Sequence, residues 1–184
     1  MPAAGISDSR EDALTYIHGV SMGHHDEALL MAYLDNGPVM LRYLEEHTPL
    51  KMTVETDASR TEYCADVPGG KCMGRKIWPD PKIMPPILEE AEKAHPIVAR
   101  VRKDPVKYLI GPRPPWVQGR ALIGALTLTC VQRGVDIIAG VRGQELIVDD
   151  GRVIGVRAER DGRDFFVKGR RGVLLATGGF EWNE

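Results

Sequence analysis

Two short groups of residues have side chains whose types and spacing could do chemistry. Gly69-Gly70-Lys71 could form the end of a phosphate-binding loop, but Ala65 stands where the leading glycine belongs and Cys72 replaces the serine or threonine that would hold magnesium. His24-His25-Asp26 could supply metal ligands, yet adjacent positions at a helix start point away from each other. From these residues we predict no phosphate loop and no metal site.

A third group, Ala176-Thr177-Gly178-Gly179-Phe180, closes an apolar run that begins at Gly172. A run that is apolar on both faces is typical of a strand buried inside a parallel sheet. Two glycines at the carboxyl end of such a strand let a ligand approach the backbone closely, and ligands of open α/β sheets bind at that edge. The same five residues could also form an ordinary strand end without a ligand. Whether they indicate a binding site therefore depends on the elements that precede them.

The preceding residues predict an ordered series of elements. A helix is expected over 119–133, a strand over 135–139, and an antiparallel meander with strands near 144–148, 152–159 and 163–168. Asp150-Gly151 and Asp161-Gly162 separate the meander strands, and both dipeptides favour tight primed turns. The elements therefore lead from a helix through a sheet to the glycine-ended strand.

The first part of the chain is predicted to be helical. A helix is expected over 8–22, a second over 26–37, where Asn36-Gly37 is a stop signal, and a third after Pro38. Residues 48–81 are expected to form a long structured loop with short strands, and the proline-rich stretch 81–118 to hold two short helices near 87–94 and 97–103.

Composition narrows the class of protein. The 184 residues include 24 Lys plus Arg against 26 Asp plus Glu, with no long basic block, so neither nucleic acid nor an anionic membrane surface is an expected partner. The apolar runs fall short of the ~18 residues of a membrane span. Three cysteines without a CxxC pair, and no signal-like segment at the start, predict a cytoplasmic location.

The run from residue 119 to residue 180 resembles the flavoprotein family of fumarate reductases and 3-ketosteroid dehydrogenases. The matching residues are Gly119, Ala121, Leu122, Gly134, Val135, Ile137, Asp150, Gly151, Arg152, Val153, Gly155, Val156 and Ala176 to Phe180. The resemblance implies an α/β fold: a partial FAD/NAD(P)-binding, Rossmann-like domain with a helical amino-terminal part and a three-stranded antiparallel meander. It implies that 1–118 face the substrate side and that 119–184 complete the FAD-binding part.

In that family a glycine-rich dinucleotide fingerprint lies upstream of this region and a substrate cap follows it. This sequence has no G-x-G-x-x-G, and we therefore expect an internal piece of a larger enzyme, inactive by itself. The stretch Glu62-Tyr63-Cys64-Ala65-Asp66-Val67-Pro68-Gly69-Gly70-Lys71, with Gly74-Arg75, is similar to the ketosteroid branch pattern D-Y-x-P-E-x-P-G-G-(K/R)-x-x-G-R. It departs from the pattern at Glu62 and Ala65, which leaves the substrate more open than the fold.

The resemblance assigns expected roles. It implies that Tyr63 is an active-site phenol, that Gly70 and Arg75 contact substrate or cofactor, and that FAD is the cofactor. Its flavin portion would meet Ala176, Thr177, Gly178 and Gly179, and its adenine would lie near Arg142 and Gly143.

The implied reaction desaturates the A ring of a steroid-like substrate, with one proton taken by a base and a hydride taken by flavin N5. A phenol titrates near ~10, so a tyrosine base needs a partner that lowers its pKa, and Tyr63 is expected to be that partner. Two alternatives stay open. A fumarate reductase or succinate dehydrogenase-like flavoprotein would need clustered Arg and His, which this segment does not display, and a non-catalytic module could retain the same sheet.

Overall fold

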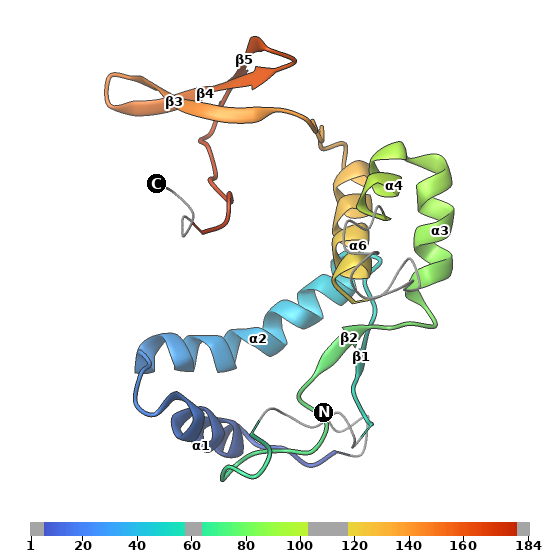
Figure 1. Cartoon of the computed structure of the whole chain (residues 1–184), viewed down its shortest axis with the longest axis vertical. Helices are drawn as coiled ribbons and strands as arrows, with labels where there is room; N and C mark the ends of the chain where they lie inside the picture. The colour runs from blue at the N-terminus through green and yellow to red at the C-terminus, as the bar shows by residue number, and fades with distance from the viewer. Residues whose placement is uncertain (1–5, 58–63, 103–117, 180–184) are drawn as a thin grey trace. The chain divides into compact units, whose positions relative to one another are not determined.

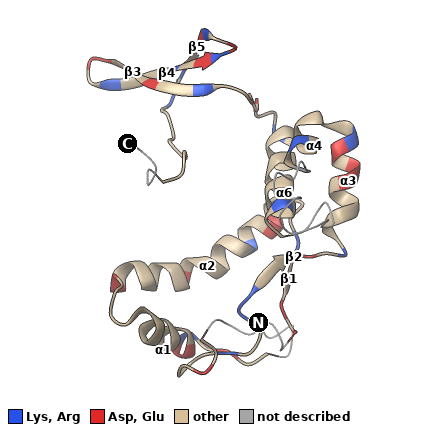
Figure 2. Cartoon of the chain, viewed as in Figure 1, with Lys and Arg blue, Asp and Glu red and all other residues tan. Residues whose placement is uncertain are grey.

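The computed structural model describes residues 6–57, 64–102 and 118–179 (Figure 1). By its internal contacts the chain divides into two units, Met1–Asp136 and Ile137–Glu184, and each is described by itself. Acidic and basic residues are both scattered along the described ribbon (Figure 2), and the formal net charge is −2 at pH 7. No helix in the described ranges is long and apolar enough to cross a lipid bilayer.

The first unit opens with two capped helices. Helix α1 (Arg10–Ser21) begins where the Ser9 side chain accepts a hydrogen bond from the Asp12 backbone N–H at 3.0 Å. Helix α2 (Glu27–His47) begins in the same way, because the Asp26 carboxylate accepts from the Leu29 N–H at 3.0 Å. Both helix starts agree with the predicted ones.

Helix α2 continues through Pro38, so the predicted division into two helices at Asn36-Gly37 is wrong. The Asn36 side-chain amide donates to the Ala32 carbonyl at 2.7 Å, one turn back, and stays within the helix instead of ending it. Farther along, Leu44 packs against the core of the unit. Tertiary packing of this kind outweighs the helix-ending preferences of Asn36 and Gly37, and here also the larger cost of a proline inside a helix, about 3 kcal/mol.

The core of the first unit is built by short elements that follow α2. Strands β1 (Met52–Val54) and β2 (Ile77–Pro79) pair antiparallel, and helices α3 (Met84–Ala94), α4 (Pro96–Arg102) and α6 (Gln118–Gln132) pack together (Figure 1). The buried core residues are Leu50, Met84, Leu88, Ala91, Val98, Ala121, Ala125 and Leu128.

These elements agree with the short strands and helices predicted between 48 and 133. Helix α6, which the sequence grouped with the meander, contributes its small side chains to the first unit's core. The predicted roles of 1–118 and 119–184 within a larger FAD domain stay predictions.

The second unit is the predicted three-stranded meander. Strands β3 (Arg142–Asp149), β4 (Arg152–Arg160) and β5 (Arg163–Lys168) pair antiparallel in sequence order. Asp150 and Gly151 have φ of 45° and 71°, and Asp161 and Gly162 have φ of 53° and 74°. Positive φ at both central residues defines the primed turn that matches the twist of a hairpin, so the two turn predictions are confirmed.

The predicted strand 135–139 and the predicted parallel strand 173–177 are not strands in this structure. Both segments are irregular, and their apolar side chains are exposed: 52% for Val135, 91% for Leu174 and 63% for Leu175. A parallel strand needs hydrogen-bonded neighbours and cover on both faces. Within the described ranges neither segment has a paired strand beside it.

Candidate functional site

The glycines of the loop 64–75 allow the backbone to approach helix α1 closely. Gly69 has a φ of 80°, and a Cβ there would meet the Asp12 carbonyl oxygen and lie 2.8 Å from the Tyr16 backbone nitrogen. A Cβ on Gly70 would lie 2.6 Å from the Ala65 carbonyl oxygen. Backbone packing therefore requires glycine at both positions: Gly69 lets the loop approach α1, and Gly70 lets the loop fold closely on itself.

Two ion pairs reinforce the contact between the loop and α1. The Arg75 guanidinium forms a two-pronged pair with Asp8, Nε to Oδ2 at 2.9 Å and Nη2 to Oδ1 at 2.8 Å, and its Cζ lies 5.5 Å from the centre of the Tyr16 ring. Lys71 Nζ donates to Asp12 Oδ2 at 2.7 Å. The loop thus carries two cations, each of which has a carboxylate of the α1 region within hydrogen-bond distance.

These pairs shift the titration of the two carboxylates. The hydrogen bond from Arg75 lowers the pKa of Asp8, with burial opposing it in part, and the hydrogen bond from Lys71 lowers the pKa of Asp12. Only 14% of the Arg75 side chain and 19% of the Asp8 side chain are exposed. Both carboxylates are therefore held in the charged form that their cations require.

Some of the predicted substrate-side residues lie in the loop 64–75 that packs on α1. Gly70 and Arg75 belong to it, and their predicted contact with substrate or cofactor stays a prediction. Tyr63 lies outside the described residues. Cys64, the next residue, is half-buried, and its carbonyl oxygen accepts the Val67 N–H at 3.1 Å at the start of the loop.

The predicted cofactor residues all belong to the second unit. Arg142 and Gly143 open strand β3, where they pair with Glu159 and Ala158 of β4, and the register shifts directly after Gly143. Such an irregularity bends a strand and frees a backbone position. Ala176 to Gly179 are exposed and irregular, and Gly178 has a φ of 83°.

Comparison with known proteins places the chain in a family. It matches the family described as FAD binding domain over residues 1–183. The chain belongs to this FAD-binding family, whose cofactor is FAD, and the predicted resemblance is confirmed.

The similar proteins give the family a more specific branch. A 3-oxosteroid 1-dehydrogenase of Mycobacterium tuberculosis is 33% identical over 98% of this chain and 38% of the relative. A 4-oxocyclohexanecarboxylate 2-dehydrogenase of Sinomonas cyclohexanicum is 30% identical over 98% of this chain and 34% of the relative. The crystal structure of a 3-ketosteroid Δ1-dehydrogenase from Sterolibacterium denitrificans, in complex with 1,4-androstadiene-3,17-dione, superposes with a TM-score of 0.67 and 25% identity, covering 95% of this chain and 38% of that one.

The chain thus spans 38% of the length of the curated steroid dehydrogenase it matches. The aligned stretch is 216 residues, longer than the 184 residues of this chain, so the relative has residues inside the matched region that have no counterpart here. The fold prediction, a partial FAD-binding domain with a helical first part and an antiparallel meander, is confirmed by the family and the structural match.

Two of the glycines predicted to contact FAD have open space beside their backbone. At Gly178 nothing lies within 4 Å of the position that a Cβ would take, which leaves the backbone accessible to a flat ring, and Gly143 is equally open. The sequence has no G-x-G-x-x-G to hold a pyrophosphate. The predicted contacts of these residues with the two ends of the cofactor stay predictions.

The structure also brings together a group of side chains that no sequence pattern indicated. His18 of α1 lies beside His25 and Glu27, at the other side of the turn between α1 and α2. From the sequence, the adjacent residues His24-His25-Asp26 are not expected to bind a metal, because neighbouring positions point away from each other. The signal that would have found His18 is the turn itself, since Gly23 two residues after the end of α1 allows the chain to reverse.

Proposed function

We propose that this chain forms part of an FAD-dependent dehydrogenase that introduces a double bond next to the ketone of a 3-ketosteroid. The observation that carries the proposal is the match to a 3-oxosteroid 1-dehydrogenase over 98% of the chain. The structural match to a steroid dehydrogenase bound to 1,4-androstadiene-3,17-dione supports the same substrate class.

The reaction removes a proton from one carbon of the A ring and a hydride from its neighbour, which leaves a double bond conjugated with the ketone. FAD, when bound, supplies the hydride acceptor. In this proposal Tyr63 donates a hydrogen bond to the base that takes the proton. A donated hydrogen bond stabilises the charged form of that base and lowers its pKa toward neutrality.

The described residues have supporting roles in this proposal. The Gly69-Gly70 backbone and the Arg75–Asp8 pair fix the loop that follows Tyr63 against α1. Arg142 and Gly143 would face the adenine end of the cofactor, and Ala176 to Gly179 its flavin end. Holding reacting groups in a fixed orientation lowers the barrier of a reaction, which is the contribution proposed for these residues.

A smaller cyclic ketone is a second candidate substrate. The 4-oxocyclohexanecarboxylate 2-dehydrogenase also matches over 98% of this chain, at 30% identity. Its substrate shares the ring ketone with a neighbouring CH–CH bond but adds a carboxylate. An arginine would recognise that carboxylate, whereas a steroid needs an extended apolar surface.

The test is an assay of the protein expressed from its complete reading frame. Dye-linked oxidation of a 3-ketosteroid, with flavin absorbance in the purified protein, is the expected result. Faster oxidation of 4-oxocyclohexanecarboxylate would favour the second candidate, and reduction of fumarate without ketone oxidation would contradict both. Absence of flavin and of all three activities would favour a non-catalytic module.

A substitution tests the role of Tyr63. We expect Tyr63→Phe to lower kcat at least about tenfold with little change in KM, and to move the rise of the pH profile toward alkaline pH, because loss of the hydrogen bond raises the pKa of the base. Tyr33→Phe is the control, since that side chain is 72% exposed on α2. An unchanged profile in Tyr63→Phe would contradict the assigned role.

A further inference from the structure

Two histidines and a glutamate meet at the turn between α1 and α2. Nε2 of His18 and Nε2 of His25 each lie 3.1 Å from the same oxygen, Oε2 of Glu27. The two imidazole rings are stacked, with centres 4.9 Å apart and planes 19° apart. The three possible ligand atoms all lie within 4.8 Å of one another. Both ring nitrogens therefore point at one small region beside the carboxylate.

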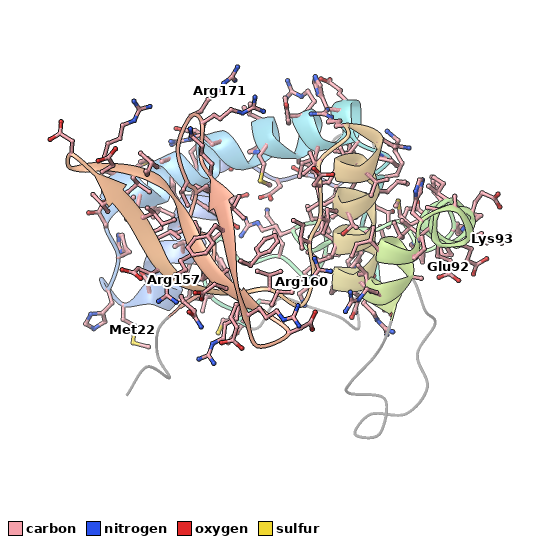
Figure 3. The ribbon with its side chains drawn as sticks, turned by 90° about the horizontal axis from the view of Figure 1, so that it is seen from above. Met22, Glu92, Lys93, Arg157, Arg160 and Arg171 are labelled. Carbon is pink, nitrogen blue, oxygen red and sulfur yellow. The ribbon has the colours of Figure 1, made fainter. Side chains whose placement is uncertain are left out.

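The backbone conformation of the turn explains why His25 and Glu27 lie beside His18. Helix α1 ends at Ser21, and the next two residues, Met22 and Gly23, have φ of 49° and 82°. Two consecutive left-handed residues reverse the chain direction, so the start of α2 comes back alongside the last turn of α1. Met22, 83% exposed, points away from the ribbon at this turn (Figure 3).

Ser21 orients the second histidine. Its Oγ lies 2.9 Å from Nδ1 of His25, which leaves Nε2 of that ring directed at Glu27. A hydroxyl can either donate to Nδ1 or accept from Nδ1–H, so it is compatible with both neutral forms of the ring. When Nδ1 carries the proton, the Nε2 lone pair is free to bind a metal. A hydrogen bond to the second ring nitrogen is the usual support of a metal-binding histidine.

We propose that His18, His25 and Glu27 bind a divalent transition-metal ion such as Zn²⁺, with water as the remaining ligand. Two imidazole nitrogens and one carboxylate oxygen suit Zn²⁺ and its neighbours, whereas Ca²⁺ and Mg²⁺ prefer oxygen alone. Bonds of roughly 2.0–2.1 Å at tetrahedral angles separate ligand atoms by about 3.3 Å, close to the two observed nitrogen–oxygen distances. The group as a whole spreads over 4.8 Å, so the two imidazole rings would turn toward each other to bind the same ion. The ion would take the place of the Nε2 protons that face Glu27, with a small withdrawal of the carboxylate.

The surroundings permit this binding. The side chains of His18, His25 and Glu27 are 44%, 22% and 52% exposed, so an ion and its water can enter without opening the fold. His18 lies in the last turn of α1, where the carbonyl groups of a helix end favour a cation. The bound ion would fasten α1 to α2 across the turn.

The experiment is a titration of the full chain, free of any histidine tag, with Zn²⁺ by calorimetry and with Co²⁺ by visible absorption. We expect one equivalent to bind, with the Co²⁺ bands of a low-coordinate nitrogen and oxygen site. His18→Gln and Glu27→Gln should each weaken binding by at least about tenfold, and Ser21→Ala by about tenfold, the loss usual for a supporting hydrogen bond.

His24→Gln is the matched control, because His24 is an exposed histidine in the same turn that lies outside the cluster. It should bind Zn²⁺ as the unsubstituted chain does. Absence of binding at one equivalent, equal affinity in His18→Gln, or an equal loss in His24→Gln would overturn the proposal. Far-UV circular dichroism of each variant separates loss of a ligand from loss of the helices. The readout is metal binding, so it is independent of dehydrogenase activity.

Discussion

At Asp8 one carboxylate joins the start of the chain to a loop almost seventy residues later. Arg75 approaches it with two nitrogens, and the ring of Tyr16 lies beneath the guanidinium. A guanidinium holds a carboxylate in a fixed orientation, which an ammonium group cannot do. The orientation of the loop 64–75 on α1 therefore depends on this pair as much as on the glycines.

The pair predicts an acid-sensitive contribution to stability. The folded pKa of Asp8 lies below its unfolded value, so its contribution is complete above the unfolded pKa and is lost as the pH falls through the folded one. We expect Asp8→Asn to lower the free energy of unfolding by about 1–3 kcal/mol at neutral pH and to flatten the loss of stability below about pH 4. Urea unfolding at several pH values measures both effects.

The control for Asp8→Asn is Glu90→Gln. Glu90 pairs with Lys93 at 3.2 Å, but the two side chains are 80% and 72% exposed, and Lys93 points outward from α3 (Figure 3). Exposed pairs contribute about 0–1 kcal/mol, so this variant should unfold almost as the unsubstituted chain does. Equal effects of the two substitutions would contradict the importance of the Asp8–Arg75 pair.

A glycine comparison tests the packing of the loop on α1. Gly69 and Gly23 have nearly equal φ, 80° and 82°, but only Gly69 has neighbours, among them the Tyr16 nitrogen, in the space of a Cβ. Both alanine variants lose the left-handed freedom of glycine, about 1 kcal/mol. We expect Gly69→Ala to cost roughly 1–3 kcal/mol more, because the loop must move away from α1. Equal costs in urea unfolding would show that the close approach is unimportant.

Among the elements, strand β4 is the centre of the second unit. The side chain of Arg157 joins both neighbouring strands, through Glu145 of β3 at 3.1 Å and Asp164 of β5 at 3.3 Å. Gly155 lies against the backbone of β5, where a Cβ would be 2.5 Å from the Val167 carbonyl oxygen. The pairing of β4 with β5 therefore requires a residue without a side chain at this position.

We expect Gly155→Ala to weaken the pairing of β4 with β5, at a cost of about 1–3 kcal/mol. Gly143→Ala is the control, because nothing lies within 4 Å of a Cβ at Gly143. Hydrogen exchange of the β5 amides measures the result, and faster exchange is expected in Gly155→Ala alone. Unchanged exchange in that variant would indicate that the strands adjust without loss of pairing.

Elements with local causes could be predicted from the sequence. The first two helices begin close to their predicted starts, where Ser9 and Asp26 cap them, and Asp150-Gly151 and Asp161-Gly162 form the expected turns, because each depends on a few neighbouring residues.

Features with distant causes could not be predicted. The segments 135–139 and 173–177 have the composition of strands, but a strand forms only beside a partner. The continuity of α2 depends on packing near Leu44, and the approach of His18 to Glu27 depends on the path of a turn. The roles of Arg142 and Gly178 depend on a cofactor, which no local pattern can position.

Across the whole chain, exposed apolar side chains mark where further contacts are expected. Leu174 and Leu175 are 91% and 63% exposed in the second unit. We expect the chain to self-associate, and the double variant Leu174→Ser, Leu175→Ser to weaken that association at least about tenfold, because each buried leucine contributes about 1.5–3 kcal/mol. Sedimentation velocity at several concentrations measures the effect.

Met22→Ser is the control for this experiment, because Met22 is a similarly exposed apolar residue, at 83%, in the turn between α1 and α2. It should leave the sedimentation unchanged. A double leucine variant that associates as strongly as the unsubstituted chain would assign self-association to another surface.

Because α2 continues through Pro38, a single helix connects the turn after α1 to the core of the first unit. At 1.5 Å per residue its 21 residues span about 31 Å, from Glu27 at one end to His47, whose carbonyl accepts from Arg133 of the helical core, at the other. A tilt of about 4° at the turn would displace the far end by about 2 Å. A movement of the turn would therefore act on the packing around Leu44 through α2 itself, and Pro38, which donates no hydrogen bond to the helix, is the position where α2 would bend first.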